Sequence, residues 1–244
     1  MEEDSDRLVE IAVIGSGGQP AAGHSVTLAL EGDGSPAGHA HPDSSKMPVD
    51  MPPGSISAQP TTVSTGVDTI LYSADLFSGL VTITASSDSI ADASAAISVR
   101  FPGLVEYQPT GDEIMVGDND KHPDNHFGSS SMVAALASLA EAHYARYGVK
   151  LWYNDISLAW GGKFTWPESV GYGRTQGHHE HSAGEAIDVQ TINYPGGYAL
   201  SLGENQPTVS GRWLMMWWGA QGGAVHDESD DNHYHLRLPG DSRR

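Results

Sequence analysis

Histidines and acidic residues gather in two stretches of the C-terminal half of this chain. Six of its 12 histidines lie between residues 178 and 235, in the stretches 178–189 and 226–238. Imidazole and carboxylate groups are ligands of divalent metal ions, and they are also common general acids and bases. Each stretch could therefore bind a metal ion or transfer protons.

Both stretches contain a short segment in which aliphatic and polar residues alternate. A strand through Asp188 would point Ile187 and Val189 to one face and the carboxylate to the opposite, solvent-accessible face. The second segment repeats this pattern, with Tyr234, Leu236 and Leu238 on one face and His233, His235 and Arg237 on the other.

The two segments together offer the residue types of a zinc site. Two imidazoles on one face of a strand lie about 6.5–7 Å apart and can serve different roles at one site. Gly184 would allow a tight turn between His181 and the Asp188 strand. The chain has no cysteine, so His, Asp and Glu remain as ligands. Two His and one carboxylate leave a fourth zinc position open, the arrangement of catalytic sites. The alternative is that each His is a surface or hydrogen-bonded residue in a solvated acidic loop.

Two helices are predicted around these segments. The serines at 129–131 offer N-caps, and Gly148 offers a stop. A second helix is expected over residues 210–221, with Gly222 and Gly223 ending it. Apolar residues recur at helical spacing in both and should be core: Met132, Val133, Leu136, Leu139, Ala140, Tyr144 and Tyr147 in the first, and Trp213, Leu214, Trp217 and Trp218 in the second.

The N-terminal half has the sequence pattern of short β-strands. Residues 8–14, 25–30, 81–85 and 95–99 are short, rich in β-branched residues and separated by turn residues, which is typical of a β-sandwich. The amino-acid sequence at residues 19–28 and 78–85 resembles bacterial Ig-like domains of the invasin and intimin type. That resemblance implies a spacer or adhesion module without catalysis. We therefore expect two domains, an Ig-like sandwich over residues 7–105 and an α+β domain over residues 111–244.

Charge and hydropathy exclude some classes of partner. Twelve Lys and Arg stand against 31 Asp and Glu, a net charge of −19. Binding to nucleic acid needs a basic face, which scattered cations do not provide. No apolar run approaches the ~20 residues of a membrane span. The acidic opening residues 1–6 have neither a basic nor an apolar region, so we expect no signal peptide in this chain.

Motifs in the C-terminal half follow the order found in a known peptidase group. His181, Gly184 and Asp188 form the pattern His-x-x-Gly-x-x-x-Asp, and His-Tyr-His-Leu-Arg-Leu follows at residues 233–238. This set resembles the zinc signature of the LAS metallopeptidases, which join lysostaphin-type endopeptidases, D-Ala-D-Ala carboxypeptidases and dipeptidases, and the hedgehog signalling domain. Residues 154–162, Asn-Asp-Ile-Ser-Leu-Ala-Trp-Gly-Gly, are most similar to the penicillin-insensitive murein endopeptidases.

The resemblance, over roughly residues 111 to 239, implies a role for each site residue. A central antiparallel sheet would carry the site, and Zn²⁺ would be bound by three ligands. His233 would be the nearby residue that handles protons, with Asp230 standing where the family has a further His, so either could be the general base. Arg174 would contact a substrate carboxylate or carbonyl, or be a structural surface residue. The zinc ligands implied are His181, Asp188 and His235.

The resemblance implies zinc-dependent hydrolysis of amide bonds in peptidoglycan peptides by an exported protein, periplasmic or extracellular. Several alternatives stay open. A D,D-carboxypeptidase or dipeptidase would trim free peptide ends instead of crosslinks. A non-catalytic, zinc-containing cell-wall binding protein would keep the ligands and lose the base. An adhesin would use mainly the N-terminal half.

Overall fold

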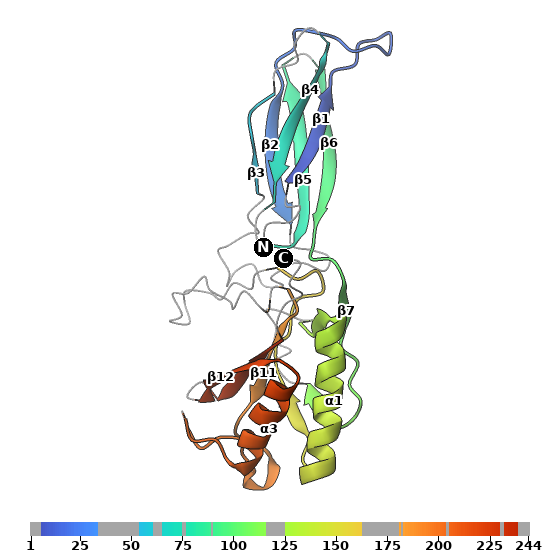
Figure 1. Ribbon diagram of the computed structural model, residues 1–244. Helices are drawn as coiled ribbons and strands as arrows, with labels where there is room; N and C mark the ends of the chain where they lie inside the picture. Colours follow the sequence, from blue (N-terminus) through green and yellow to red (C-terminus); the bar gives the residue numbers. More distant parts are fainter. Residues whose placement is uncertain are drawn as a thin grey trace.

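The computed structural model describes residues 6–33, 54–60, 65–74, 77–88, 90–115, 125–162, 181, 183–203, 205–229 and 232–238. Within this part of the chain the fold is rich in β-strands and contains two α-helices, as Figure 1 shows. Buried apolar side chains form two separate clusters, one in each half of the chain. No helix among the described residues is long and apolar enough to cross a membrane.

Two three-stranded antiparallel sheets make up the N-terminal half. The first has the order β1-β4-β3 and the second the order β2-β5-β6. The strands are β1 (Asp6–Ala12), β2 (Thr27–Asp33), β3 (Ser55–Ile56), β4 (Val67–Ser73), β5 (Gly79–Ser87) and β6 (Ile90–Val99). The four predicted strand segments are found as β1, β2, β5 and β6. Strand β4 was not predicted, although Ile70 and Tyr72 alternate with more exposed residues along it.

Both N-terminal sheets contribute to one apolar cluster. Ile70 and Tyr72 of β4 lie in it together with Leu28 of β2 and Val81 and Ile83 of β5. Side chains two residues apart on a strand share a face, so each sheet turns one face to this cluster. The half is therefore held by its own core.

A five-stranded sheet forms the centre of the C-terminal half, in the order β12-β13-β11-β10-β8. Its strands are β8 (Glu113–Met115), β10 (Leu151–Tyr153), β11 (Ala186–Gln190), β12 (Ala224–Glu228) and β13 (His233–Arg237). All neighbours are antiparallel except β8 and β10, which pair in parallel. The predicted central antiparallel sheet is thus wrong at one edge, because the chain that joins β8 to β10 passes through a helix instead of a hairpin. A small sheet of β7 (Leu104–Glu106) and β9 (Phe127–Ser129) precedes that helix.

The helices lie close to the predicted positions. Helix α1 (Ser130–Tyr147) begins where the Ser129 hydroxyl accepts a hydrogen bond from the Met132 amide, and it ends at Gly148 in the left-handed conformation. Helix α3 (Val209–Ala220) is capped by the Thr208 hydroxyl. A short 3-10 helix, η2 (Pro195–Gly197), lies between β11 and α3.

One part of the predicted helical core is wrong. Tyr144 is 41% exposed, and the fully buried residue at that turn of α1 is its neighbour His143. The His143 ring is satisfied inside the protein, with Nδ1 2.9 Å from the Val149 carbonyl and Nε2 2.8 Å from the Tyr198 hydroxyl. Both residues fit a helical repeat from Ala140, and the inward position of His143 is favoured by its hydrogen-bonding partners together with the rings of Tyr147 and Trp213 that pack against it.

The C-terminal core joins both helices to the inner face of the sheet. Leu136 and Leu139 of α1 and Leu214 and Trp218 of α3 are fully buried in it. The sheet contributes Leu151, Tyr153, Ile187, Val189, Tyr234 and Leu236. Trp213 and Trp217 are only partly buried against this core. The aliphatic faces predicted for β11 and β13 are confirmed, which leaves the opposite face of these strands for polar residues.

Candidate metal centre

The strand register places polar residues in two rows on the outer face of the sheet. Strand β13 lies between β11 and β12, and paired residues on neighbouring antiparallel strands lie side by side. One row is Asp188, His235 and His226, and the next is Gln190, His233 and Glu228. Residues two apart share a face, so both rows face the same side.

His181 reaches this face from outside the sheet. Its ring Nδ1 donates a hydrogen bond of 2.7 Å to the Ile156 carbonyl. The Gly184 amide donates to the His181 carbonyl at 3.0 Å, which closes a tight turn, and Gly184 has φ +65°. A Cβ at Gly184 would lie 2.7 Å from the Gly128 Cα, so only glycine fits there. The predicted turn between His181 and the Asp188 strand is confirmed.

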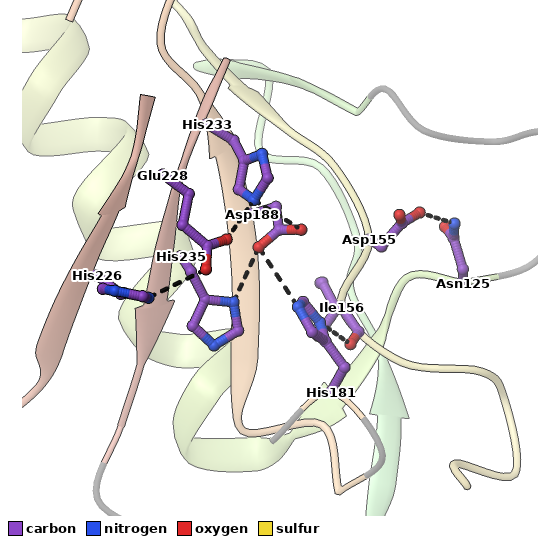
Figure 2. Close-up of polar contacts among 9 residues, drawn as sticks. All are labelled: Asn125, Asp155, Ile156, His181, Asp188, His226, Glu228, His233 and His235. Carbon is purple, nitrogen blue, oxygen red and sulfur yellow. Dashed lines mark hydrogen bonds and ion pairs between the residues drawn. The ribbon is translucent and has the colours of Figure 1, made fainter. Parts of the chain in front are cut away.

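Three of the predicted site residues converge (Figure 2). His181 Nε2 lies 3.4 Å and His235 Nδ1 lies 3.0 Å from Asp188 Oδ1. Their potential ligand atoms all lie within 4.8 Å of one another, and the group could hold a metal ion. The side chains of His181 and His235 are 5% and 4% exposed, and that of Asp188 is 16% exposed.

The residue types of this group, two imidazoles and one carboxylate, are those that bind a divalent ion such as zinc. Zinc ligands lie about 2.1 Å from the ion, so two of them at a tetrahedral angle are about 3.4 Å apart. The separations from Asp188 to the two histidines are close to this value. Because the Ile156 carbonyl holds Nδ1 of His181, the other ring nitrogen is left to face Asp188, and such hydrogen bonds commonly orient metal-binding histidines.

Charge at the group favours a cation. Burial lowers the pKa of His181, but the Asp188 carboxylate and the Ile156 carbonyl outweigh it and raise the pKa to about 9. Burial raises the pKa of Asp188, whereas His181, His235 and His233 together hold it well below its usual range. Asp188 is therefore ionised, and a bound metal ion would take the place of the proton on His181.

His233 lies beside the three converging residues but does not belong to their group. Its Nε2 is 3.7 Å from Asp188 Oδ2 and 2.7 Å from Glu228 Oε2. The other oxygen of Glu228 lies 3.0 Å from His226 Nδ1. Glu228 was not among the site residues predicted from the sequence. A hairpin between β12 and β13 could have indicated this residue, because the register of that hairpin places residue 228 opposite residue 233.

Residues 154–157, which lie in the segment 154–162 singled out in the sequence, hold the metal centre in place through hydrogen bonds of their backbone. The Asn154 amide donates to the Asp188 carbonyl at 2.8 Å, and the Asp188 amide donates to the Asp155 carbonyl at 3.3 Å. The Asn125 side-chain amide donates to the Asp155 carboxylate, and the Asn125 backbone carbonyl accepts from the amides of Ile156 and Ser157. No role was predicted for this segment, which anchors both the backbone of Asp188 and the Ile156 carbonyl that accepts from His181.

The remaining predicted site residues, Asp230 and Arg174, lie outside the described residues. No family model matches the chain, and no curated protein matches it. The assignment of a function therefore depends on the order of the motifs and on the geometry of the group formed by His181, Asp188 and His235.

Proposed function

We propose that this protein hydrolyses amide bonds in peptidoglycan peptides with a catalytic zinc ion, in the manner of murein endopeptidases. One observation gives this proposal its main support. His181, Asp188 and His235 come from two separate stretches of the chain and converge within 4.8 Å, and their order and spacing resemble the LAS signature. A three-ligand set of two His and one carboxylate is typical of catalytic zinc, because the fourth position stays available to water or substrate.

Different residues of the chain would bind the metal ion and transfer the proton. His181 Nε2, Asp188 Oδ1 and His235 Nδ1 would hold the ion. Zinc bound there would lower the pKa of water toward about 7 and polarise the scissile carbonyl. His233 lies on the same face of the sheet, with Nε2 3.7 Å from Asp188 Oδ2, and would give the hydrogen on Nε2 to the leaving amine, whereas Asp230, the other candidate base, would take the proton from water. The partly exposed Asp188 edge leaves the substrate an approach from solvent.

The domain arrangement belongs to the same proposal. Residues 7–105 would be an Ig-like sandwich that serves as a spacer or adhesion module, and residues 111–244 would be the peptidase domain. Peptidoglycan lies outside the cytoplasmic membrane, so the working location would be periplasmic or extracellular. The separate apolar clusters of the two halves are consistent with independent units.

The test is digestion of purified sacculi by the full chain, with metal analysis of the same preparation. We expect about one zinc per chain, release of soluble muropeptides, loss of release with a chelator, and recovery with added zinc. Mass spectrometry of defined muropeptides identifies the bond: split crosslinked dimers support an endopeptidase. Release of terminal D-Ala alone would instead support a carboxypeptidase.

A loaded but inactive protein would contradict the hydrolase. If the chain contained zinc, bound sacculi and released nothing, a cell-wall binding role would replace the proposed one. The Asp188→Asn variant is the matched control, because it removes the ligand charge while keeping the shape of the side chain.

A further inference from the structure

The second row of the outer face contains a carboxylate, Glu228, that the proposed chemistry has not used. Glu228 on β12 lies opposite His233 on β13, and their side chains meet at 2.7 Å. We infer that Glu228 is a positioning residue that acts through His233, and this inference rests on the proposed function. Glu228 holds the imidazole in one orientation and one tautomer beside the metal centre.

The geometry assigns the tautomer. His233 Nε2 faces the Glu228 carboxylate at 2.7 Å and the Asp188 carboxylate at 3.7 Å. A nitrogen that faces two carboxylates carries the hydrogen, since carboxylate oxygens only accept. The hydrogen on Nε2 donates to Glu228 Oε2. The ring therefore keeps Nε2 turned toward the side on which the metal ligands converge, as Figure 2 shows.

The backbone alone would leave the imidazole free to turn. A strand determines on which side a side chain emerges, but the χ2 rotation of a His is broad. His233 and Glu228 are 19% and 18% exposed, so solvent reaches them and the aliphatic core does not lock either one. A charge-assisted hydrogen bond between two side chains on adjacent strands supplies the missing constraint.

Glu228 is itself held from the solvent side. Its second oxygen lies 3.0 Å from Nδ1 of His226, whose side chain is 74% exposed on the edge strand β12. A series of side-chain contacts thus runs from the edge of the sheet to the metal centre, through His226, Glu228, His233 and Asp188. The strength of the constraint decreases outward, because the exposed His226 can exchange its partner for water.

The inference is tested with Glu228→Gln, which keeps the shape and removes the charge. Three measurements are made on the zinc-loaded full chain: the tautomer of His233 from long-range ¹H–¹⁵N spectra, the zinc affinity by chelator competition, and kcat and KM on a crosslinked muropeptide dimer. We expect the Nε2–H tautomer in the unsubstituted protein and a mixture of tautomers in the variant. Side chains that orient the residues of a metal site by hydrogen bonds typically contribute about 10- to 100-fold to activity, so kcat should fall roughly 10- to 100-fold, with KM and zinc affinity within about twofold.

Two controls separate positioning from general structure. Glu141→Gln makes the same chemical change on an exposed position of α1 and should leave all three measurements unchanged. His226→Ala removes the outer partner and should lower kcat only two- to threefold. Equal thermal unfolding temperatures would show that all variants are folded.

Several outcomes would overturn the inference. An Nδ1–H tautomer in the unsubstituted protein, or an unchanged tautomer in Glu228→Gln, removes its basis. A fall in zinc affinity as large as the fall in kcat would make Glu228 part of metal binding instead. If the unsubstituted protein hydrolyses nothing, the proposed function fails, while the tautomer of His233 with and without the Glu228 charge still decides the positioning role.

Discussion

At the scale of residues, the centre depends on one carboxylate between two imidazoles. Asp188 Oδ1 lies 3.0 Å from His235 and 3.4 Å from His181. Each histidine is more than nine-tenths buried, so neither can leave the group without disturbing its surroundings. The carboxylate therefore determines both the charge and the spacing of the candidate ligands.

Replacing Asp188 by Asn should remove metal binding. The amide keeps the shape but contributes no negative charge to a site whose other two ligands are neutral when bound. Loss of a residue that only orients a ligand costs at most roughly 100-fold in zinc affinity, so we expect loss of a ligand to cost more, and hydrolysis to be lost with it. Metal analysis after dialysis measures this, with Asp92→Asn on exposed β6 as the control. Full zinc occupancy in Asp188→Asn would refute the ligand assignment.

Zinc affinity should depend on pH through His181. Its pKa of about 9 in the metal-free protein means that its ring is protonated at neutral pH and must release a proton to bind zinc. Asp188 stays ionised throughout, so it adds no slope in this range. Apparent affinity should rise about tenfold per pH unit from pH 7 toward 9 and level off above. Chelator competition across pH 7–10 tests this, and a flat profile below pH 9 would contradict it.

At the scale of elements, the hairpin β12–β13 and the turn at Gly184 bring the ligands together. The hairpin places His233 and His235 on the face opposite Tyr234 and Leu236, and the turn brings His181 back over β11. A one-residue slip in the register of β13 would turn both histidines into the core. The buried faces of these strands therefore protect the site geometry.

Replacing Gly184 by Ala should damage both stability and metal binding. A residue with a Cβ is strained at φ +65°, and its Cβ would meet the backbone of Gly128 and the side chain of Leu104. Strain of this kind costs about 1–3 kcal/mol, and relief of the clash would shift His181. Urea unfolding and zinc titration measure the two effects. Gly219→Ala in α3, where nothing lies within 4 Å, should be neutral or stabilising.

At the scale of the whole molecule, two apolar clusters support two halves. Contacts between the halves include a hydrogen bond from the Ser78 hydroxyl to the Gly161 carbonyl and one of 2.9 Å from the Phe101 amide to the Trp160 carbonyl. Residues 160 and 161 belong to the segment that continues from Ile156. The N-terminal half thus touches the chain that supports the metal centre, without contributing any of the three converging residues.

Core substitutions in the two halves should separate their stabilities. Leu136→Ala in the C-terminal core and Ile83→Ala in the N-terminal core should each cost about 2–5 kcal/mol. Calorimetry should show two transitions, with zinc raising only the one that Leu136→Ala lowers, because a ligand stabilises the unit that binds it. A single transition that zinc and both substitutions shift equally would show that the halves unfold together.

Much of this arrangement is contained in local sequence. The alternation around Asp188 and across residues 233–238 predicts which face is aliphatic, and this holds since burial of apolar side chains decides the face of a strand. The caps at Ser129 and Gly148 predict the ends of α1 for the same local reason. The residue types at 181, 188 and 235 determine that any metal there is bound by nitrogen and oxygen.

Which residues of distant segments become neighbours was decided by the tertiary structure alone. Glu228 becomes the partner of His233 only through the register of a hairpin, and Ile156 holds His181 across 25 residues of chain. His143 replaced Tyr144 in the core because Val149 and Tyr198 satisfy its ring, and β8 joined its neighbour in parallel. Such pairings depend on non-local hydrogen bonds and packing, and these form only when segments distant in the chain have met.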